Sequence, residues 1–227
     1  MNVNASEADV KQRVKKVKKP AGAKWSEPAV VLDRARYQAD GQGFLKPQFR
    51  QIFVLPASGG TARQLTSGDF HYGSDLSFTP DSTALVFSAN LDPEWEYQPR
   101  DSNLYQLDLA TEQLIALTTM PGNESSPVFS PDGKQLAFLW QSNALVPYSN
   151  SKLKILNLSS NKISDIAADF DRSVEQPNWL SNSSFVVQYD DRGQRKLATL
   201  SSSGKITDLT ASLGGVSQPQ PYLSGSY

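Results

Sequence analysis

The stretch Pro127-Val-Phe-Ser-Pro-Asp-Gly-Lys-Gln-Leu-Ala-Phe138 decides the fold of this chain. An aromatic residue, Phe129, is followed at once by Ser-Pro-Asp-Gly, which supplies the residues that tight turns prefer. A short apolar run, Gln135-Leu-Ala-Phe138, comes next. The stretch therefore predicts two antiparallel strands joined by a tight turn.

The same pattern occurs at two other places in the chain. Leu76-Ser-Phe-Thr-Pro-Asp81 precedes it and Pro177-Asn-Trp-Leu-Ser-Asn182 follows it. The aromatic positions Phe78, Phe129 and Trp179 are 51 and 50 residues apart. Every copy leads into a short apolar strand, at residues 84–87, 135–138 and 184–187. A fixed period of this length indicates a repeat architecture.

A second hairpin follows in each unit, and apolar and polar residues alternate along its strands. Alternation with a period of two indicates half-buried strands rather than helices. The hairpins pair residues 104–109 with 113–117, 153–158 with 162–166, and 196–200 with 205–209, and an earlier copy pairs 51–55 with 62–65.

Four strands in each unit of about 50 residues are typical of β-propeller blades. We therefore predict an all-β fold, a partial β-propeller of about four four-stranded antiparallel blades. The expected domain is 25–227, with blades at about 25–66, 74–118, 125–167 and 175–210 and the start of another at 218–227. The first blade, which includes Val30-Val-Leu-Asp33, lacks a Ser-Pro-Asp strand, so an open ring is expected. Unpaired strand edges at the ends of an open ring favour self-association.

Composition is that of a soluble folded protein. Of 227 residues, 38% are hydrophobic and 20% are charged, and there is no cysteine. Disulfides and thiolate metal sites are therefore excluded, and with a single histidine we expect no metal and no cofactor. No apolar run reaches the ~20 residues of a membrane helix, and the start lacks the pattern of a secretory signal. We expect a soluble chain with no membrane partner.

Residues 1–24 carry seven Lys or Arg against Glu7 and Asp9. Clustered cations of this kind can bind nucleic acid by releasing counterions from phosphate. No aromatic residues interleave with the basic residues to stack on bases, which favours a solvated basic leader or linker and no nucleic-acid partner.

Several strings resemble a known family more closely than the repeat alone does. The turn motif resembles the TolB-like propeller repeat. Over about residues 25–227 the chain resembles propellers in the acylaminoacyl peptidase and dipeptidyl peptidase branch of the prolyl oligopeptidase family of serine peptidases. The strings that carry this resemblance are Tyr37-Gln-Ala-Asp-Gly-Gln-Gly-Phe-Leu45, Gly59-Gly-Thr-Ala-Arg-Gln-Leu-Thr66, Phe87-Ser-Ala-Asn90 and Gln188-Tyr-Asp-Asp-Arg-Gly193.

The resemblance implies a role beside a catalytic domain rather than catalysis by this chain. In that family the propeller caps an α/β-hydrolase domain and filters peptide substrates. No serine here stands in a Gly-x-Ser-x-Gly nucleophile elbow, and His71 is expected to be solvated or bonded to a turn. We expect no catalytic residues and a parent serine peptidase. The alternative is a free-standing TolB-like module that binds protein partners, and fold analogy supports both.

The most distinctive loop is Asn90-Leu-Asp-Pro-Glu-Trp-Glu-Tyr-Gln-Pro-Arg-Asp101. It gathers acidic, aromatic and arginine residues where a simple connection between strands needs none. Glu94 or Glu96 is a candidate for binding a peptide amino terminus, and Arg100 for a carbonyl or carboxylate. The alternative is a solvated loop whose Trp95 and Tyr97 pack on a neighbouring blade.

Overall fold

Short strands, most of them in four-stranded sheets, make up the computed structural model, which describes residues 2–4, 20–24, 31–46, 48–73, 75–146 and 148–214. The basic run at residues 11–19, Val30 and the predicted start of a further blade at 218–227 lie outside this part of the chain. The strands are β1 (Asn2–Asn4), β2 (Gln38–Ala39), β3 (Gly43–Phe44), β4 (Gln48–Arg50), β5 (Phe53–Val54), β6 (Arg63–Gln64), β7 (Ser77–Phe78), β8 (Ala84–Ala89), β9 (Asn103–Asp108), β10 (Leu114–Ala116), β11 (Asn123–Phe129), β12 (Gln135–Gln141), β13 (Lys152–Asn157), β14 (Lys162–Ile166), β15 (Glu175–Ser181), β16 (Ser184–Asp191), β17 (Gln194–Ser201) and β18 (Ile206–Asp208).

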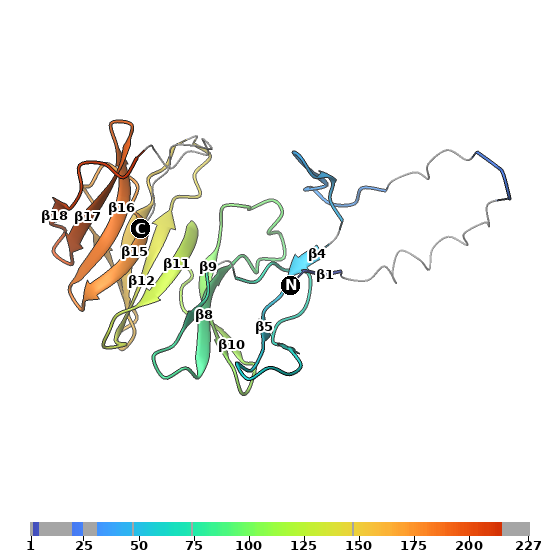
Figure 1. Cartoon of the computed structure of the whole chain (residues 1–227), viewed down its shortest axis with the longest axis horizontal. Coiled ribbons are helices and arrows are strands. Elements are labelled where there is room, and N and C mark those ends of the chain that lie inside the picture. The colour runs from blue at the N-terminus through green and yellow to red at the C-terminus, as the bar shows by residue number, and fades with distance from the viewer. Residues whose placement is uncertain are drawn as a thin grey trace.

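Three four-stranded antiparallel sheets follow one another across the molecule in sequence order (Figure 1). They are β7–β10, β11–β14 and β15–β18, and in each one neighbours along the chain are neighbours in the sheet. This arrangement confirms the predicted all-β, partial propeller fold. The described residues include no helix, and so none long and apolar enough to cross a membrane.

The second strands β8 and β12 are buried on both faces because apolar residues of the neighbouring units pack on either side of them. In β12, Leu136 and Phe138 pack back against the preceding sheet, whereas Ala137 and Leu139 pack forward against the next one. All four side chains are at most 7% exposed. Burial on both faces explains why these strands are almost continuously apolar in sequence.

Pairs of polar residues fix the turns between the first and second strands of each sheet. The Thr79 hydroxyl donates to Asp81 Oδ1 at 2.7 Å, and the Ser130 hydroxyl donates to Asp132 Oδ1 at the same distance. These hydrogen bonds to the carboxylates lower the pKa of both Asp81 and Asp132. The turns also connect the sheets, because the Asp132 backbone N–H donates to Asn182 Oδ1 at 3.1 Å.

A repeated threonine closes the outer hairpins. The backbone N–H groups of Ile52, Leu104 and Leu197 each donate to a threonine hydroxyl at 2.9, 2.8 and 3.1 Å. The acceptors are Thr66, Thr118 and Thr210, each of which follows a leucine at the end of its unit. These hydroxyls satisfy strand N–H groups that the outer strand no longer reaches.

The N-terminal unit differs from the other three. Its described residues form only two-stranded pairs: β1 with β4, β2 with β3, and β5 with β6. The β5–β6 pair matches the predicted earliest hairpin, whereas β1, which pairs with β4, lies inside residues 1–24, the segment expected to be a leader or linker. Residues 31–50 are rich in Arg, Gln and Gly and contain no apolar run that could form an inner strand buried on both faces.

Candidate functional site

The loop from Asn90 to Asp101 connects β8 with β9 and lies at the end of the sheets opposite the Asp-containing turns (Figure 1). It is held by its own backbone, since the N–H groups of Trp95 and Tyr97 donate to Asp92 O and Glu94 O at 3.0 and 2.9 Å. Antiparallel alternation places the connections β12–β13 and β16–β17 at the same end. Arg100 Nη1 donates to Val146 O at 3.2 Å, which joins the loop to the β12–β13 connection.

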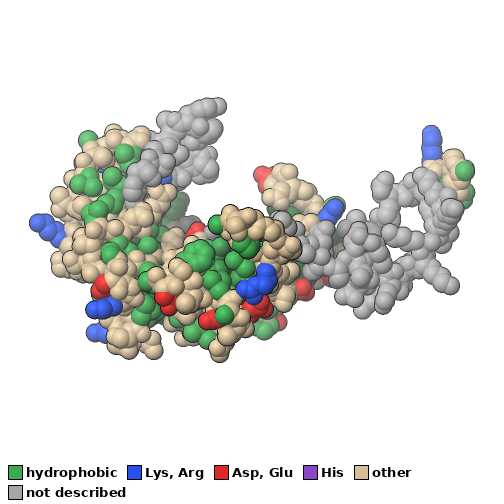
Figure 2. All heavy atoms as spheres, turned by 60° about the horizontal axis from the view of Figure 1, so that its bottom comes forward, with side chains coloured by type: hydrophobic (Ala, Val, Ile, Leu, Met, Phe, Trp, Pro, Cys, Tyr) green, Lys and Arg blue, Asp and Glu red, His purple; other side chains and the backbone are tan. Residues whose placement is uncertain are grey.

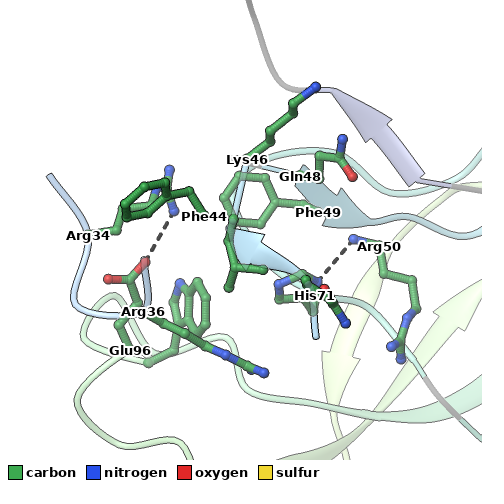
Figure 3. Close-up of a pocket in the computed structure, with 12 residues that line it drawn as sticks. Arg34, Arg36, Phe44, Lys46, Gln48, Phe49, Arg50, His71 and Glu96 are labelled. Atoms are coloured by element: carbon green, nitrogen blue, oxygen red, sulfur yellow. Dashed lines mark hydrogen bonds and ion pairs between the residues drawn. The ribbon is translucent and has the colours of Figure 1, made fainter. Parts of the chain in front are cut away.

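A pocket of about 680 Å³ opens beside this loop. Its walls come from three parts of the chain: the N-terminal segment 34–50, His71, and the loop residues Trp95 and Glu96. Figure 3 shows Arg34 and Glu96 on one side and His71 with Arg50 on the other. The pocket therefore depends on contacts between residues that are far apart in sequence.

An ion pair joins the N-terminal segment to the loop. Arg34 Nη1 donates to Glu96 Oε1 at 3.2 Å, and the Ala35 N–H donates to Glu96 Oε2 at 2.9 Å. Only 15% of the Glu96 side chain is exposed, so its bond with Arg34 is partly shielded from solvent. Arg34 also lies 3.6 Å from Asp69 and 4.9 Å from the centre of the Phe49 ring. Both carboxylate oxygens of Glu96 thus have partners inside the protein.

Aromatic rings form the apolar part of the pocket. Trp95 meets Phe49 and His71 edge to face, with ring centres 6.4 and 5.5 Å apart. Phe49 and His71 are themselves 5.4 Å apart. Such edge-to-face contacts are the favoured geometry for aromatic pairs, and they fix the loop against the N-terminal segment.

His71 takes part in this wall through a backbone hydrogen bond. Its Nδ1 accepts the Arg50 backbone N–H at 3.2 Å, so the neutral ring carries its proton on Nε2. Burial lowers the pKa of His71, and the nearby Arg50, Arg36 and Arg34 lower it further. His71 is therefore a neutral hydrogen-bond donor at physiological pH. The expectation of a solvated or turn-bonded histidine did not place this exposed side chain in a pocket wall.

The three residues singled out in the sequence are in different environments. Glu96 lines the pocket, Glu94 is exposed, and Arg100 holds the neighbouring loop. Trp95 packs on Phe49, whereas Tyr97 is 72% exposed. Sequence reasoning did not find the cationic lining of the pocket, which consists of Arg34, Arg36, Lys46 and Arg50. Its only signal was the density of basic residues between positions 34 and 50.

Among the residues that the structure describes, no group of three or more His, Asp or Glu side chains is placed to hold a metal ion. Hydrogen-bond donors, cations and aromatic rings are what the pocket offers to a ligand.

Residues 24–148 match the family model described as the dipeptidyl peptidase IV (DPP IV) N-terminal region. Two similar curated proteins are the probable dipeptidyl-peptidase 5 of Emericella nidulans, 34% identical over 76 residues, and the dipeptidyl-peptidase 5 of Trichophyton tonsurans, 38% identical over 81 residues. The aligned segments cover 34% and 35% of this chain. They span only 10% and 11% of the relatives' own length.

Solved structures show the same fold at low sequence identity. A puromycin-hydrolyzing peptidase of Mycobacterium tuberculosis aligns with a TM-score of 0.58 at 15% identity, over 73% of this chain and 28% of that one. A putative TolB from Agrobacterium tumefaciens aligns with a TM-score of 0.53 at 17% identity, over 70% of this chain and 56% of that one. These likenesses support the propeller fold.

Proposed function

The chain belongs to the family of the dipeptidyl peptidase IV N-terminal region, and on that premise we propose that it positions peptide substrates for an α/β-hydrolase domain that lies outside this sequence. It is a propeller region of peptidase-family proteins. In the proposed role the sheets are a rigid scaffold, and the loops at one end admit and orient the peptide.

The observation that carries this proposal is the difference between the two ends of the sheets. One end has short turns, fixed by Asp81 and Asp132. The other end has the loop 90–101 and the pocket of about 680 Å³, which is within the range of ligand-binding cavities. Function in repeat scaffolds is commonly carried by loops on one face.

Exposed apolar side chains at the loop end support a partner there. Tyr97 is 72% exposed, Leu145 98% and Tyr148 88%. They belong to two connections that the Arg100–Val146 hydrogen bond holds together. We propose that this end faces the hydrolase domain, so that a bound peptide lies between the two domains.

The three loop residues then have separate roles. Glu94 is exposed, and its carboxylate has no partner among the described residues, so it is the group available to a peptide amino terminus. Glu96 is a positioning residue that holds Arg34 in the pocket wall. Arg100 keeps the loop against its neighbour.

Fluorescence anisotropy with labelled hexapeptides tests this proposal. We expect saturable binding to the chain, and weaker binding of peptides with a free amino terminus to Glu94→Gln, by ~1.5–3 kcal/mol for a lost charge-assisted hydrogen bond. Glu112→Gln is the matched control, because Glu112 is exposed between β9 and β10 at the turn end. We also expect no hydrolysis of dipeptidyl chromogenic substrates by this chain alone. Absence of peptide binding at any concentration up to millimolar would overturn the proposal.

A further inference from the structure

Charge in the pocket is strongly unbalanced. Four of its lining residues, Arg34, Arg36, Lys46 and Arg50, are cationic, and Glu96 is the single acidic residue among them. Glu96 is already bonded to Arg34 Nη1 and to the Ala35 N–H. The one carboxylate is therefore used within the wall and does not offset the other three cations.

Those three cations have no acidic partner among the described residues. Arg50 Nη1 donates only to a carbonyl, Gly73 O, at 3.3 Å. Arg36 and Lys46 make no hydrogen bond or ion pair within the described part of the chain. In Figure 3 Lys46 and Arg50 extend from neighbouring parts of the segment that carries Phe49. Cations concentrated in a concave site raise the local concentration of anions.

His71 lies in the field of the arginines that line the pocket. Three arginines disfavour its protonation, in addition to burial. Because Nδ1 accepts the Arg50 N–H, the remaining ring nitrogen is a donor. The histidine thus adds a hydrogen-bond donor and no acceptor to a wall rich in cationic donors.

Apolar surface lies directly beside these donors. Trp95, Phe49 and His71 are in mutual contact, and Phe44, which is 59% exposed, lies at the rim. A ligand that fits must combine an anionic group with an apolar or aromatic neighbour. Arginine binds carboxylates in a planar, two-bond geometry, which suits Arg36 and Arg50 to this task.

We propose that the pocket binds a carboxylate group of a peptide, next to an apolar residue, with Arg36, Lys46 and Arg50 as its cationic partners. The inference rests on the proposed peptide-positioning function and specifies its substrate class. The carboxylate comes from an Asp or Glu side chain or from the carboxy terminus of a short peptide.

Isothermal titration calorimetry with three blocked dipeptides tests the inference without involving an amino terminus. Acetyl-Phe-Asp-amide presents a side-chain carboxylate, acetyl-Phe-Ala presents a terminal carboxylate, and acetyl-Phe-Asn-amide presents neither. We expect at least one acidic peptide to bind about tenfold more tightly than the neutral one, and the peptide that does so identifies the source of the carboxylate.

The variants Arg36→Gln and Lys46→Gln should each reduce that affinity about tenfold, and added salt should weaken it. Matched controls are Arg63→Gln and Lys205→Gln, which change exposed cations at the turn end and should leave binding unchanged. Because Arg36 and Lys46 are exposed, both variants are expected to fold.

Equal affinity for all three dipeptides overturns the carboxylate site and leaves the proposed function standing. The same holds if hexapeptides with a free amino terminus bind and none of the blocked dipeptides does. If neither set binds, peptide positioning itself fails, and this inference fails with it.

Discussion

Different contacts stabilise two regions of the molecule, the array of three sheets at residues 77–208 and the N-terminal segment at 31–50. In the array, β8 and β12 are buried on both faces, and Phe87, Phe138 and Phe185 are fully buried. In the segment, strands are two or three residues long, and Phe44 is 59% exposed. Contacts of Arg34 and Phe49 with the 90–101 loop hold the segment in place.

The difference separates the scaffold from the proposed recognition surface. Packing between neighbouring sheets of the array fixes their relative positions. Because each sheet packs on the next, the order of one sheet stabilises the order of its neighbour. The segment contributes side chains to a pocket and little to the core. On the face seen in Figure 2, which includes parts of the array, acidic and basic side chains are interspersed, whereas the pocket is lined by four cationic residues and one acidic residue.

The largest expected effect comes from a core substitution in the array. Phe138→Ala removes a fully buried ring that packs with Val86, Leu104 and Leu156 between two sheets. We expect a loss of about 3–5 kcal/mol in the free energy of unfolding, measured by urea denaturation. Phe44→Ala at the pocket rim is the matched control, with an expected change within about 0.5 kcal/mol. Equal losses at the two positions would contradict the division into scaffold and recognition surface.

A second effect concerns a buried carboxyl between the first two four-stranded sheets. Glu124 is fully buried; one carboxylate oxygen accepts bonds from the Leu104 N–H and the Thr118 hydroxyl, and the other has no partner in the described structure. Burial raises the pKa of Glu124 from 4.5 to about 7. The folded state therefore holds a proton that the unfolded state releases.

The sign of the resulting pH dependence follows from this raised pKa. The contribution of protonated Glu124 to stability is complete below pH 4.5 and is lost as the pH rises through about 7. Between pH 5 and pH 8 the wild type should lose up to about 3 kcal/mol relative to Glu124→Gln. Urea denaturation of both proteins across this range measures the difference, with Glu112→Gln as an exposed control. A difference that does not change with pH would show that Glu124 is not protonated in the fold.

A smaller effect is expected where the segment meets the array. Glu96→Gln weakens the ion pair with Arg34, whose side chain is 31% exposed, so we expect a loss of about 1 kcal/mol or less. The clearer readout is local: trypsin should cut after Arg34 and Arg36 several-fold faster. Glu112→Gln, which removes the exposed pair with Arg63, should not change this rate. Unaltered cleavage in Glu96→Gln would mean that the pair does not hold the segment.

The smallest effect tests a turn within the array. Ser82 has φ 58° at the position where the next sheet has Gly133 with φ 69°. Side chains disfavour this left-handed region, so Ser82→Gly should stabilise the protein by about 0.5–1 kcal/mol in thermal denaturation. Ser183→Gly at the corresponding turn of the third sheet is the control, since Ser183 is not among the residues with positive φ. That change should be neutral or slightly destabilising.

The strands could be predicted from the sequence where buried apolar residues recur at a regular spacing. The run Ala84-Leu-Val-Phe87 is continuously apolar because sheets cover both of its faces, and such runs recur at a fixed spacing. The glycine that ends Tyr189-Asp-Asp-Arg-Gly193 is typical of a hairpin turn, and Arg192 and Gly193 both have positive φ there. These features depend on neighbours in sequence or on the repeat.

The pocket could not be predicted in the same way. Arg34, His71 and Glu96 are brought together by the fold, and no local pattern links them. The loop was recognised by its composition, but composition did not distinguish Glu96, whose carboxylate is bonded within the wall, from the exposed Glu94. Long-range pairing of charges requires the fold to be known first.

Hydrogen exchange with and without a saturating hexapeptide locates the peptide on the molecule and so tests whether it binds at the loop end. We expect slower exchange at residues 31–50 and 90–101 and around His71, at the loop end. We expect no change at the turns 79–83, 130–134 and 181–184. Protection of those turns, or of no segment at all under conditions where the peptide is bound, would contradict the assignment of the loop end as the peptide-binding surface.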